Sequence, residues 1–365
     1  MAKAGPVIAV PIRQPISFTL CCGRRQRGGG GHWALQVFSP FNLAQVSPLE
    51  ARVCRLAEGC KAGHLARMKA LPDILCIGSV LWDIIGRAPV HMQAGADVPG
   101  RITRLPGGVA MNIAMTLARF GLDPAVLTAI GRDAEGQELV ANAARLGVDC
   151  SFAYMSDDLP TDRYMAVEAA NGLIAAIADA HSLEAAGDKI LRPLADGRLA
   201  GADAPWAGPI ALDGNLTQGL LADIAASPLF ARADLRIAPA SPGKAERLLP
   251  ILPMPNATLY VNIEEAGLLC QRRFDSAPEA AEGLLARGAC RVLVTDGGKP
   301  AADGRRGAGV ISACPRPVLV TRVTGAGDTF MAAHLVAELR GVDRAAALAA
   351  ALEAAALYVS GDIGS

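Results

Sequence analysis

The sequence predicts an α/β protein: a doubly wound, mainly parallel sheet flanked by helices, with a small second β-sheet. Three observations lead to this fold class. Short apolar runs alternate with amphipathic segments from residue 73 onward, which is typical of βαβ units. Two segments interrupt this alternation with hairpin-like patterns. Finally, 52% of the 365 residues are apolar and 19% are charged, so the chain can bury a substantial core.

The main sheet is expected from apolar runs that follow one another along the chain. We predict strands at residues 74–77, 125–129, 210–212, 235–238, 257–262 and 292–295. Amphipathic patterns predict helices at residues 112–120 and 135–146, and a further helical run covers residues 331–340. Strands that alternate with helices in this way form a parallel sheet with helices on both faces.

A projecting sheet is expected from residues 88–104 and 152–179. Within the second segment, Tyr164–Glu168 and Leu173–Ala178 read as two strands joined across Asn171-Gly172, a dipeptide preferred in type I′ turns. Together the two segments would form a small antiparallel sheet that serves as a lid. An ordinary edge hairpin is the alternative.

Charge and composition exclude two classes of partner. Lys plus Arg and Asp plus Glu both number 35, so no overall field favours nucleic acid or an anionic membrane surface. The longest apolar stretches are broken well short of the roughly 20 residues that a membrane span needs. Four of the nine cysteines fall within the first 67 residues, and the other five are scattered singly without metal-ligand or disulfide-framework spacing. We therefore expect a soluble cytoplasmic protein with reduced thiols.

The first 67 residues differ from the rest of the chain. They carry nine Lys or Arg against only Glu50 and Glu58, and they show no sustained period of 2 or 3.6. We expect residues 1–67 to be a disordered or spurious extension, with a transit peptide as the alternative. Met68 begins a run that leads directly into the first strand, so residues 68–365 are expected to form the folded domain.

The most informative motif is Gly325-Ala326-Gly327-Asp328, which leads into a helix. Small residues let the backbone approach an anion, and the free N–H groups of a first helical turn stabilise negative charge. We therefore expect residues 325–327 to form an anion hole for a transferring phosphate. Asp328 would accept the proton of a substrate hydroxyl as catalytic base. A tight turn with an Asp cap is the alternative.

Together with Thr329-Phe330, which follows it, the Gly325–Asp328 motif resembles the C-terminal signature of the ribokinase-like (PfkB) carbohydrate and nucleoside kinases. Residues 105–114 resemble the N-terminal signature of the same family, with Gly107-Gly108 ahead of Asn112. The glycines would let a sugar ring lie against the backbone, and Asn112 offers a donor and acceptors to its hydroxyls. Residues 78–83 resemble the family's first strand, which implies that Asp83 accepts hydrogen bonds from ribose hydroxyls.

Two shorter motifs imply contacts with ATP and Mg²⁺. Asn262 and Glu265 match the family's Asn-x-x-Glu element, whose polar pair helps to position Mg²⁺, usually through water. Thr295 and Gly297 match its Thr-x-Gly turn, which contacts nucleotide phosphates, although Pro300 stands where the family commonly has Gly. The sequence leaves open a monovalent-cation requirement and the oligomeric state, although such kinases often pair through their lids.

Within the family, residues 160–179, 211–216 and 237–245 resemble segments of pseudouridine kinases. This likeness implies ATP-dependent phosphorylation of the 5′-hydroxyl of pseudouridine, with Lys244 donating to a base carbonyl oxygen. A solvated first-turn lysine is the alternative for Lys244. Ala238 and Ala180 depart from the pseudouridine kinase pattern. Other PfkB-type sugar or nucleoside kinases (ribokinase, fructokinase or adenosine kinase-like) and a non-catalytic sensor are therefore kept as alternatives.

Overall fold

The computed structural model describes residues 71–361, which belong to one compact unit of the chain. The expected extension at residues 1–67 and the expected start at Met68 lie outside the described residues. Within residues 71–361, no helix has both the length and the apolar character needed to cross a membrane.

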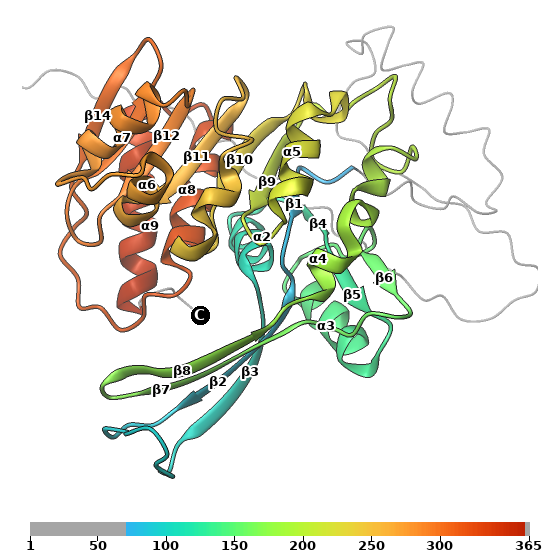
Figure 1. The fold of residues 1–365 in the computed structure, drawn as a ribbon, viewed down its shortest axis with the longest axis vertical. Helices are drawn as coiled ribbons and strands as arrows, with labels where there is room; N and C mark the ends of the chain where they lie inside the picture. The colour runs from blue at the N-terminus through green and yellow to red at the C-terminus, as the bar shows by residue number, and fades with distance from the viewer. Residues whose placement is uncertain (1–70, 362–365) are drawn as a thin grey trace, which may run out of the picture. The chain divides into compact units, whose positions relative to one another are not determined.

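The core of this unit is an eight-stranded sheet (Figure 1). Its strands are β1 (Ile74–Ile77), β4 (Pro124–Leu127), β9 (Pro209–Asp213), β10 (Asp234–Ala238), β11 (Ala257–Asn262), β12 (Arg291–Thr295), β13 (Ala301–Arg305) and β14 (Gly309–Ala313). They lie in the order β14-β13-β12-β11-β10-β9-β1-β4. Neighbours from β12 to β4 are parallel, and β13 and β14 add an antiparallel edge. The mainly parallel sheet is thus confirmed.

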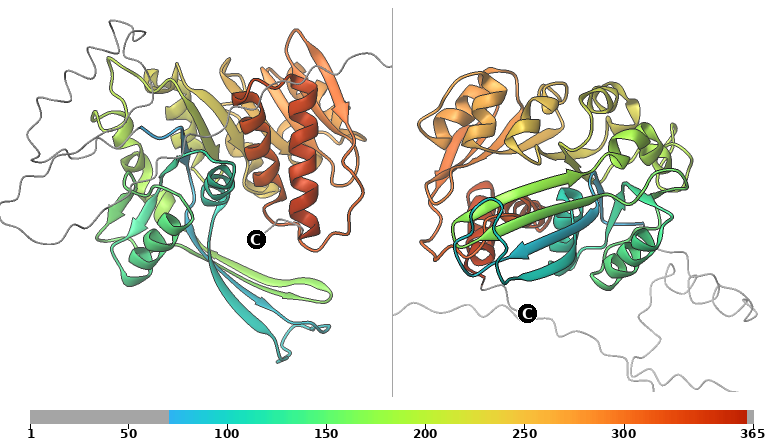
Figure 2. Two further views of the ribbon diagram at one scale, coloured as in Figure 1. Left: turned by 180° about the vertical axis from the view of Figure 1, so that it is seen from behind. Right: turned by 60° about the horizontal axis from the view of Figure 1, so that its bottom comes forward.

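Helices cover both faces of the sheet. The helices of the described residues are α2 (Val109–Arg119), α3 (Ala134–Arg145), α4 (Ser182–Ala186), α5 (Gln218–Ala226), α6 (Ile263–Cys270), α7 (Ala277–Ala286), α8 (Ala326–Leu339) and α9 (Arg344–Ser360), with 3₁₀ turns η2 (Gly187–Leu194), η3 (Pro228–Phe230) and η4 (Pro242–Leu248). Of these, α3 and α4 contact the strand β5 (Ala129–Gly131) outside the main sheet. Successive strand residues face opposite layers. Leu75 and Ile77 belong to the same buried apolar cluster as residues of α5, α6 and α7, whereas Ile74 and Cys76 belong to the cluster that contains residues of α2, α8 and α9. Seen from behind, α8 and α9 lie side by side (Figure 2).

The sheet has a topological switch point between β1 and β9. The chain passes from β1 to β4 on one side and later builds β9 to β12 on the other side. In open parallel sheets, ligands bind in the crevice outside the carboxyl ends of the strands at such a point. The expected site residues should therefore gather just beyond Ile77 and Asp213.

A second sheet projects from this edge (Figure 1), in the order β3-β2-β7-β8. Its strands are β2 (Leu81–Arg87), β3 (Arg101–Gly107), β7 (Arg163–Ala169) and β8 (Gly172–Asp179). The outer pairs are antiparallel, but β2 and β7 run parallel. The expectation of an all-antiparallel sheet was therefore wrong. Most of the expected lid segment 88–104 is the connection between β2 and β3 rather than strand.

The hairpin turn also differs from the expected one. Ala169 pairs with Gly172, so Ala170-Asn171 forms the turn, one residue earlier than expected. Neither residue has the positive φ of a type I′ turn. The Asn171 side chain instead accepts a hydrogen bond from Met92 N and donates one to Met92 O, both at 3.0 Å. A contact with the β2–β3 connection therefore fixes this turn, and local sequence cannot reveal it.

The expected strand at residues 125–129 is divided in two. After β4, the chain starts β5 (Ala129–Gly131), which pairs in parallel with β6 (Tyr154–Ser156) as a separate two-stranded sheet. The break falls at Thr128, a buried residue between two apolar runs, and periodicity alone does not show that the chain leaves the main sheet there.

A buried polar network fixes α8 against the sheet. Glu338 of α8 lies between Arg236 of β10 and Arg291 of β12, and it forms an ion pair with each. His334, one turn earlier on α8, is fully buried and shares a 2.8 Å hydrogen bond with Tyr260 of β11. His334 is therefore a packed core residue. The network holds α8 in a fixed register, and the amino end of α8 carries Asp328.

Candidate active site

Asp213 organises the floor of the switch-point crevice. Its carboxylate lies at the carboxyl end of β9 and is fully buried. One oxygen accepts hydrogen bonds from Ser79 N and Oγ, both at 2.7 Å, and from Ala110 N at 3.3 Å. The other oxygen accepts from Asn215 N. Asp213 thus joins β1, β9 and the first turn of α2. In the sequence, Asp213 stood out only as part of residues 211–216, which resemble a segment of pseudouridine kinases.

Asp83 lies on β2, where the projecting sheet leaves the core. Its neighbours in the sheet are Leu105 of β3 and Tyr164 of β7. Burial raises the pKa of Asp83 to about 6, and no described residue hydrogen-bonds to its carboxylate. Buried polar groups normally have partners. Asp83 therefore has its hydrogen-bonding capacity available for a ligand.

Gly107 makes room for the side chain of Asp83. A Cβ placed there would lie 1.9 Å from Asp83 Oδ2, so the absence of a side chain makes room for that carboxylate. The contact with Asp83 is by itself enough to explain why position 107 is a glycine, without the expected approach of a sugar ring to the backbone. Gly108, with a φ of 93°, is the N-cap of α2.

Asn112 and Asp328 meet although 216 residues separate them in the chain. Asn112 Nδ2 donates a 3.0 Å hydrogen bond to Asp328 Oδ2. Asn112 was expected to bind substrate, and the structure places its amide on the candidate base. Because this bond favours the ionised carboxylate, it opposes the other influences on Asp328.

The pKa of Asp328 is raised to about 7. Burial is the main cause, and the carboxylates of Asp213, Asp83 and Glu265 raise it further, against the lowering effect of Asn112. A carboxylate with a pKa near neutrality can both accept and release a proton at physiological pH. This property supports the expected role of Asp328 as a base.

The Gly-rich loop presents fewer free donors than expected. Gly325 is the N-cap of α8 with a φ of 89°, and Ala326 N donates to Val323 O at 3.1 Å. The Ala326 N–H therefore closes a turn instead of facing an anion. The N–H groups of Gly325 and Gly327 donate to none of the described residues. These two groups, at the positive end of the α8 dipole, are the anion-hole candidates that remain.

Lys244 lies on η4 and reaches the residues that follow β9. Its ammonium donates to Asn215 Oδ1, and Asn215 Nδ2 in turn donates to Ser79 Oγ at 2.9 Å. Lys244 is half-buried, so it is not a fully solvated first-turn residue. The side chain belongs to the same hydrogen-bonded group as Asp213.

Asn262 and Glu265 form a capping box at the start of α6. Asn262 Oδ1 accepts from Glu265 N, and Glu265 Oε2 accepts from Asn262 N, both at 2.8 Å. Burial raises the pKa of Glu265. The second carboxylate oxygen of Glu265 is left for other donors. Among residues 71–361, no three His, Cys, Asp or Glu side chains form a metal-binding group.

This donor set fits a hydrated Mg²⁺ ion rather than a directly coordinated one. Mg²⁺ retains several waters and is often held by one or two carboxylates together with substrate phosphates. Glu265 Oε1 can accept a hydrogen bond from such a water. Thr295 lies beside Asn262 in the parallel register of β11 and β12. Gly297, with a φ of 55°, follows in the next turn.

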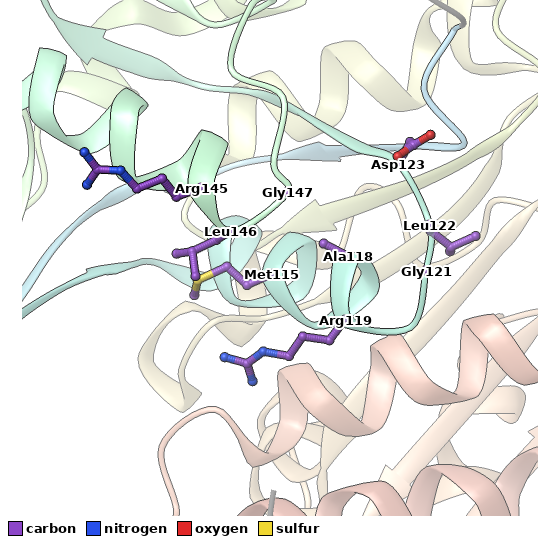
Figure 3. Close-up of a pocket in the computed structure, with 9 residues that line it drawn as sticks. All are labelled: Met115, Ala118, Arg119, Gly121, Leu122, Asp123, Arg145, Leu146 and Gly147. Carbon is purple, nitrogen blue, oxygen red and sulfur yellow. The ribbon is translucent and has the colours of Figure 1, made fainter. Parts of the chain in front are cut away.

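The expected residues thus converge on one edge of the main sheet. Asp83, Asp213 and Glu265 are each close enough to Asp328 to raise its pKa electrostatically. A separate hollow of about 500 Å³ lies at the carboxyl ends of α2 and α3 (Figure 3), lined by Met115, Ala118, Arg119, Gly121, Leu122, Asp123, Arg145, Leu146 and Gly147. Because it contains none of these four carboxylates, we do not assign it to the same site.

The fold of the described residues is that of the ribokinase-like class of α/β proteins. A carbohydrate kinase from Agrobacterium tumefaciens superposes with a TM-score of 0.66 at 24% identity, covering 81% of this chain and 94% of that one. Arabidopsis thaliana ribokinase, solved with ribose and ATP, superposes with a TM-score of 0.63 at 21% identity, covering 79% and 93%. These likenesses show the fold.

The chain belongs to the pfkB carbohydrate kinase family, whose family model matches residues 71–362. Among curated relatives, the uncharacterized sugar kinase YeiI of Escherichia coli (strain K12) is 35% identical over 109 residues, 30% of each chain. Pseudouridine kinase of the same strain is 35% identical over 81 residues, 22% of this chain and 26% of that one. The matched regions thus span less than a third of these two relatives. Fructoselysine 6-kinase of Shigella flexneri is 28% identical over 63% of this chain and 80% of its own length.

Proposed function

We propose that this protein transfers the γ-phosphoryl group of ATP to the 5′-hydroxyl of pseudouridine, giving pseudouridine 5′-phosphate and ADP. One observation carries the phosphotransfer: Asp328, with a pKa raised to about 7, lies next to the free N–H groups that begin α8. A base and an anion site in adjacent positions are the two parts that phosphoryl transfer to a hydroxyl requires.

Each residue has a defined part in this reaction. Asp83 accepts hydrogen bonds from the sugar hydroxyls, and Asn112 holds Asp328 in position. The substrate oxygen bonds to the γ-phosphorus as the bond to the β-phosphate oxygen breaks, and the hydroxyl proton passes to Asp328. The N–H groups of Gly325 and Gly327 stabilise the charge on the transferring group.

Thr295, Gly297 and Glu265 are proposed to bind Mg-ATP. Bound Mg²⁺ supplies positive charge beside the phosphates. Thr295 and Gly297 lie where β12 ends, next to the start of α6, so they could contact the nucleotide, and Glu265 would help to hold the hydrated ion. The projecting sheet is proposed to act as a lid that excludes water and suppresses ATP hydrolysis.

Two observations favour a nucleoside over a plain sugar. Lys244 donates to Asn215 inside the crevice and can exchange this partner for a base carbonyl oxygen. In addition, the region matched by pseudouridine kinase is 35% identical, although it covers 22% of this chain. The phosphotransfer itself does not depend on this choice of substrate.

The test is ADP release by purified protein with Mg-ATP across pseudouridine, uridine, adenosine, ribose, fructose, fructoselysine and 2-keto-3-deoxygluconate. We expect selective turnover of pseudouridine. Turnover of another compound would retain the kinase and reject the substrate. Inactivity with every compound would favour a non-catalytic sensor with the same fold.

Lys244→Ala is expected to raise the KM for pseudouridine about tenfold, because a charge-assisted hydrogen bond to the base is lost. Any slow turnover of ribose should be unaffected, since ribose has no base. Lys189→Ala is the matched control, because Lys189 is a half-buried lysine that contacts Tyr154 instead. Equal losses with both substrates would contradict a role for Lys244 in recognising the base.

We also propose that two copies pair through the face of the projecting sheet that lies opposite Asp83. Ile102, Met165 and Ile177 carry 78%, 46% and 61% exposed side chains there, and Met165 is paired directly with Ile177. Exposed apolar side chains gathered on one face indicate an interaction surface. Ile177→Asp should convert a dimer into a monomer in light scattering. A wild-type monomer at high concentration would refute the proposal.

A further inference from the structure

The carboxyl end of α9 is joined to the loop that precedes the anion hole. Thr321 N and Oγ1 donate to Val359 O at 2.8 and 3.0 Å, and Arg322 Nε donates to Tyr358 O at 2.7 Å. The last carbonyls of a helix lack partners within the helix. Here the loop supplies these partners, and a positively charged side chain is favourable at this end of the helix dipole.

Tyr358 extends this contact to the anion hole itself. Its Oη donates a 2.8 Å hydrogen bond to Thr324 O, and the Arg322 guanidinium lies 4.0 Å from the centre of its ring. A Cβ on Gly325 would lie 2.5 Å from the same Oη. The tyrosine hydroxyl therefore occupies the space that any side chain at position 325 would need.

The hydrogen bond from Tyr358 Oη to Thr324 O determines the direction in which the Gly325 N–H points. Thr324 C=O and Gly325 N–H belong to one peptide group, and the described chain contains no cis peptide bond. In a planar trans peptide the two groups point in opposite directions. When Tyr358 holds the carbonyl toward α9, the Gly325 N–H must point away from α9. This N–H is one of the free donors at the start of α8.

We propose that Tyr358 is a positioning residue for phosphoryl transfer, which orients the Gly325 N–H toward the γ-phosphate through Thr324. Arg322 holds the Tyr358 ring in place. This inference rests on the proposed kinase function. It adds a residue from the last helix that touches neither the substrate hydroxyl nor Asp328, and it explains why position 325 requires glycine.

Tyr358→Phe removes only the hydroxyl, so it tests the proposal directly. We expect kcat to fall about tenfold, because an oriented oxyanion donor contributes mainly to the transition state. The KM for the phosphate acceptor should be unchanged. The affinity for the β,γ-imido analogue of ATP should fall about fivefold, as for one misplaced hydrogen bond. The affinity for ADP, which lacks the γ-phosphate, should be unchanged.

Tyr260→Phe is the control for a purely structural effect. Tyr260 is buried in the network that holds α8, so this variant should lower Tm and leave the ratio of analogue to ADP affinity unchanged. Arg322→Met should change that ratio in the same direction as Tyr358→Phe, by a smaller factor.

Two results would overturn the proposal: wild-type kcat and affinity ratio in Tyr358→Phe, or equal losses of analogue and ADP affinity together with a lowered Tm. The nucleotide-binding measurements need no acceptor substrate. A wrong substrate assignment would therefore leave this test intact, and it can be distinguished from failure of the inference.

Discussion

Replacing Asp328 with Asn should lower kcat by about 10²- to 10⁴-fold, the range that a general base contributes. The amide keeps the shape of the side chain and can still accept a hydrogen bond from Asn112, which in the wild-type protein donates to Asp328 Oδ2. It cannot accept the proton of the attacking hydroxyl. KM values should change little, because the loss falls on the chemical step. Steady-state ADP release gives both constants.

The pH dependence of the wild-type enzyme provides a second measurement of the same residue. The ionised carboxylate is the active form, and the pKa of Asp328 is raised to about 7. kcat/KM should therefore fall about tenfold per pH unit below this value and level off above it. Asp328→Asn should lose this acidic limb.

Asp343→Asn is the matched control for Asp328→Asn, because Asp343 caps the start of α9 and Asn is an equally good cap. Its activity and pH profile should equal those of the wild type. Unchanged turnover in Asp328→Asn, or an acidic limb that survives in it, would show that another group accepts the proton.

The fold could be predicted because its signals are local. Buried parallel strands are short apolar runs, and the helices between them carry an amphipathic period. Residues 74–77 and 257–262 accordingly match β1 and β11 in full. The projecting sheet was less predictable, since pairing between β2 and β7 joins residues about 80 positions apart. The sequence of either strand alone does not show which strand it pairs with.

The candidate site could be predicted as a set of residues but not as a set of contacts. Gly325, Gly327 and Asp328 were visible because a Gly-rich turn before a helix has a known electrostatic consequence. The pairing of Asn112 with Asp328 depends on how α2 packs against α8. Tyr358 gave no local signal, because an aromatic residue near the end of an Ala-rich helix ordinarily indicates core packing.

Some residues serve the fold and the proposed chemistry at once. Asn262 and Glu265 were expected to position Mg²⁺, and they also form a complete capping box. A capping box alone would explain the Asn-x-x-Glu spacing. The buried Glu265 carboxylate nevertheless raises the pKa of Asp328, which links the start of α6 electrostatically to the candidate base.

Asp83→Asn should raise the KM for the phosphate acceptor by about 10- to 100-fold. The Asp83 carboxylate is half-buried without a protein donor, and hydrogen bonds to a charged group are worth about 1.5–3 kcal/mol. Affinity for the ATP analogue should be unchanged. Because the Asp83 charge raises the pKa of Asp328, its removal should also move the acidic limb of kcat/KM toward lower pH.

Gly107→Ala tests the contact between Asp83 and the acceptor hydroxyls by displacing the Asp83 carboxylate instead of replacing it. The new Cβ would lie 1.9 Å from Asp83 Oδ2, so the carboxylate must move and the KM for the acceptor should rise as it does in Asp83→Asn. Gly219→Ala is the control, because a Cβ at Gly219 of α5 meets no atom within 4 Å. If both Asp83→Asn and Gly107→Ala kept the wild-type KM, the acceptor hydroxyls would have to bind elsewhere in the crevice. In that case the desolvated carboxylate of Asp83 would act only through its effect on the pKa of Asp328, and the shift of the acidic limb would be its sole kinetic effect.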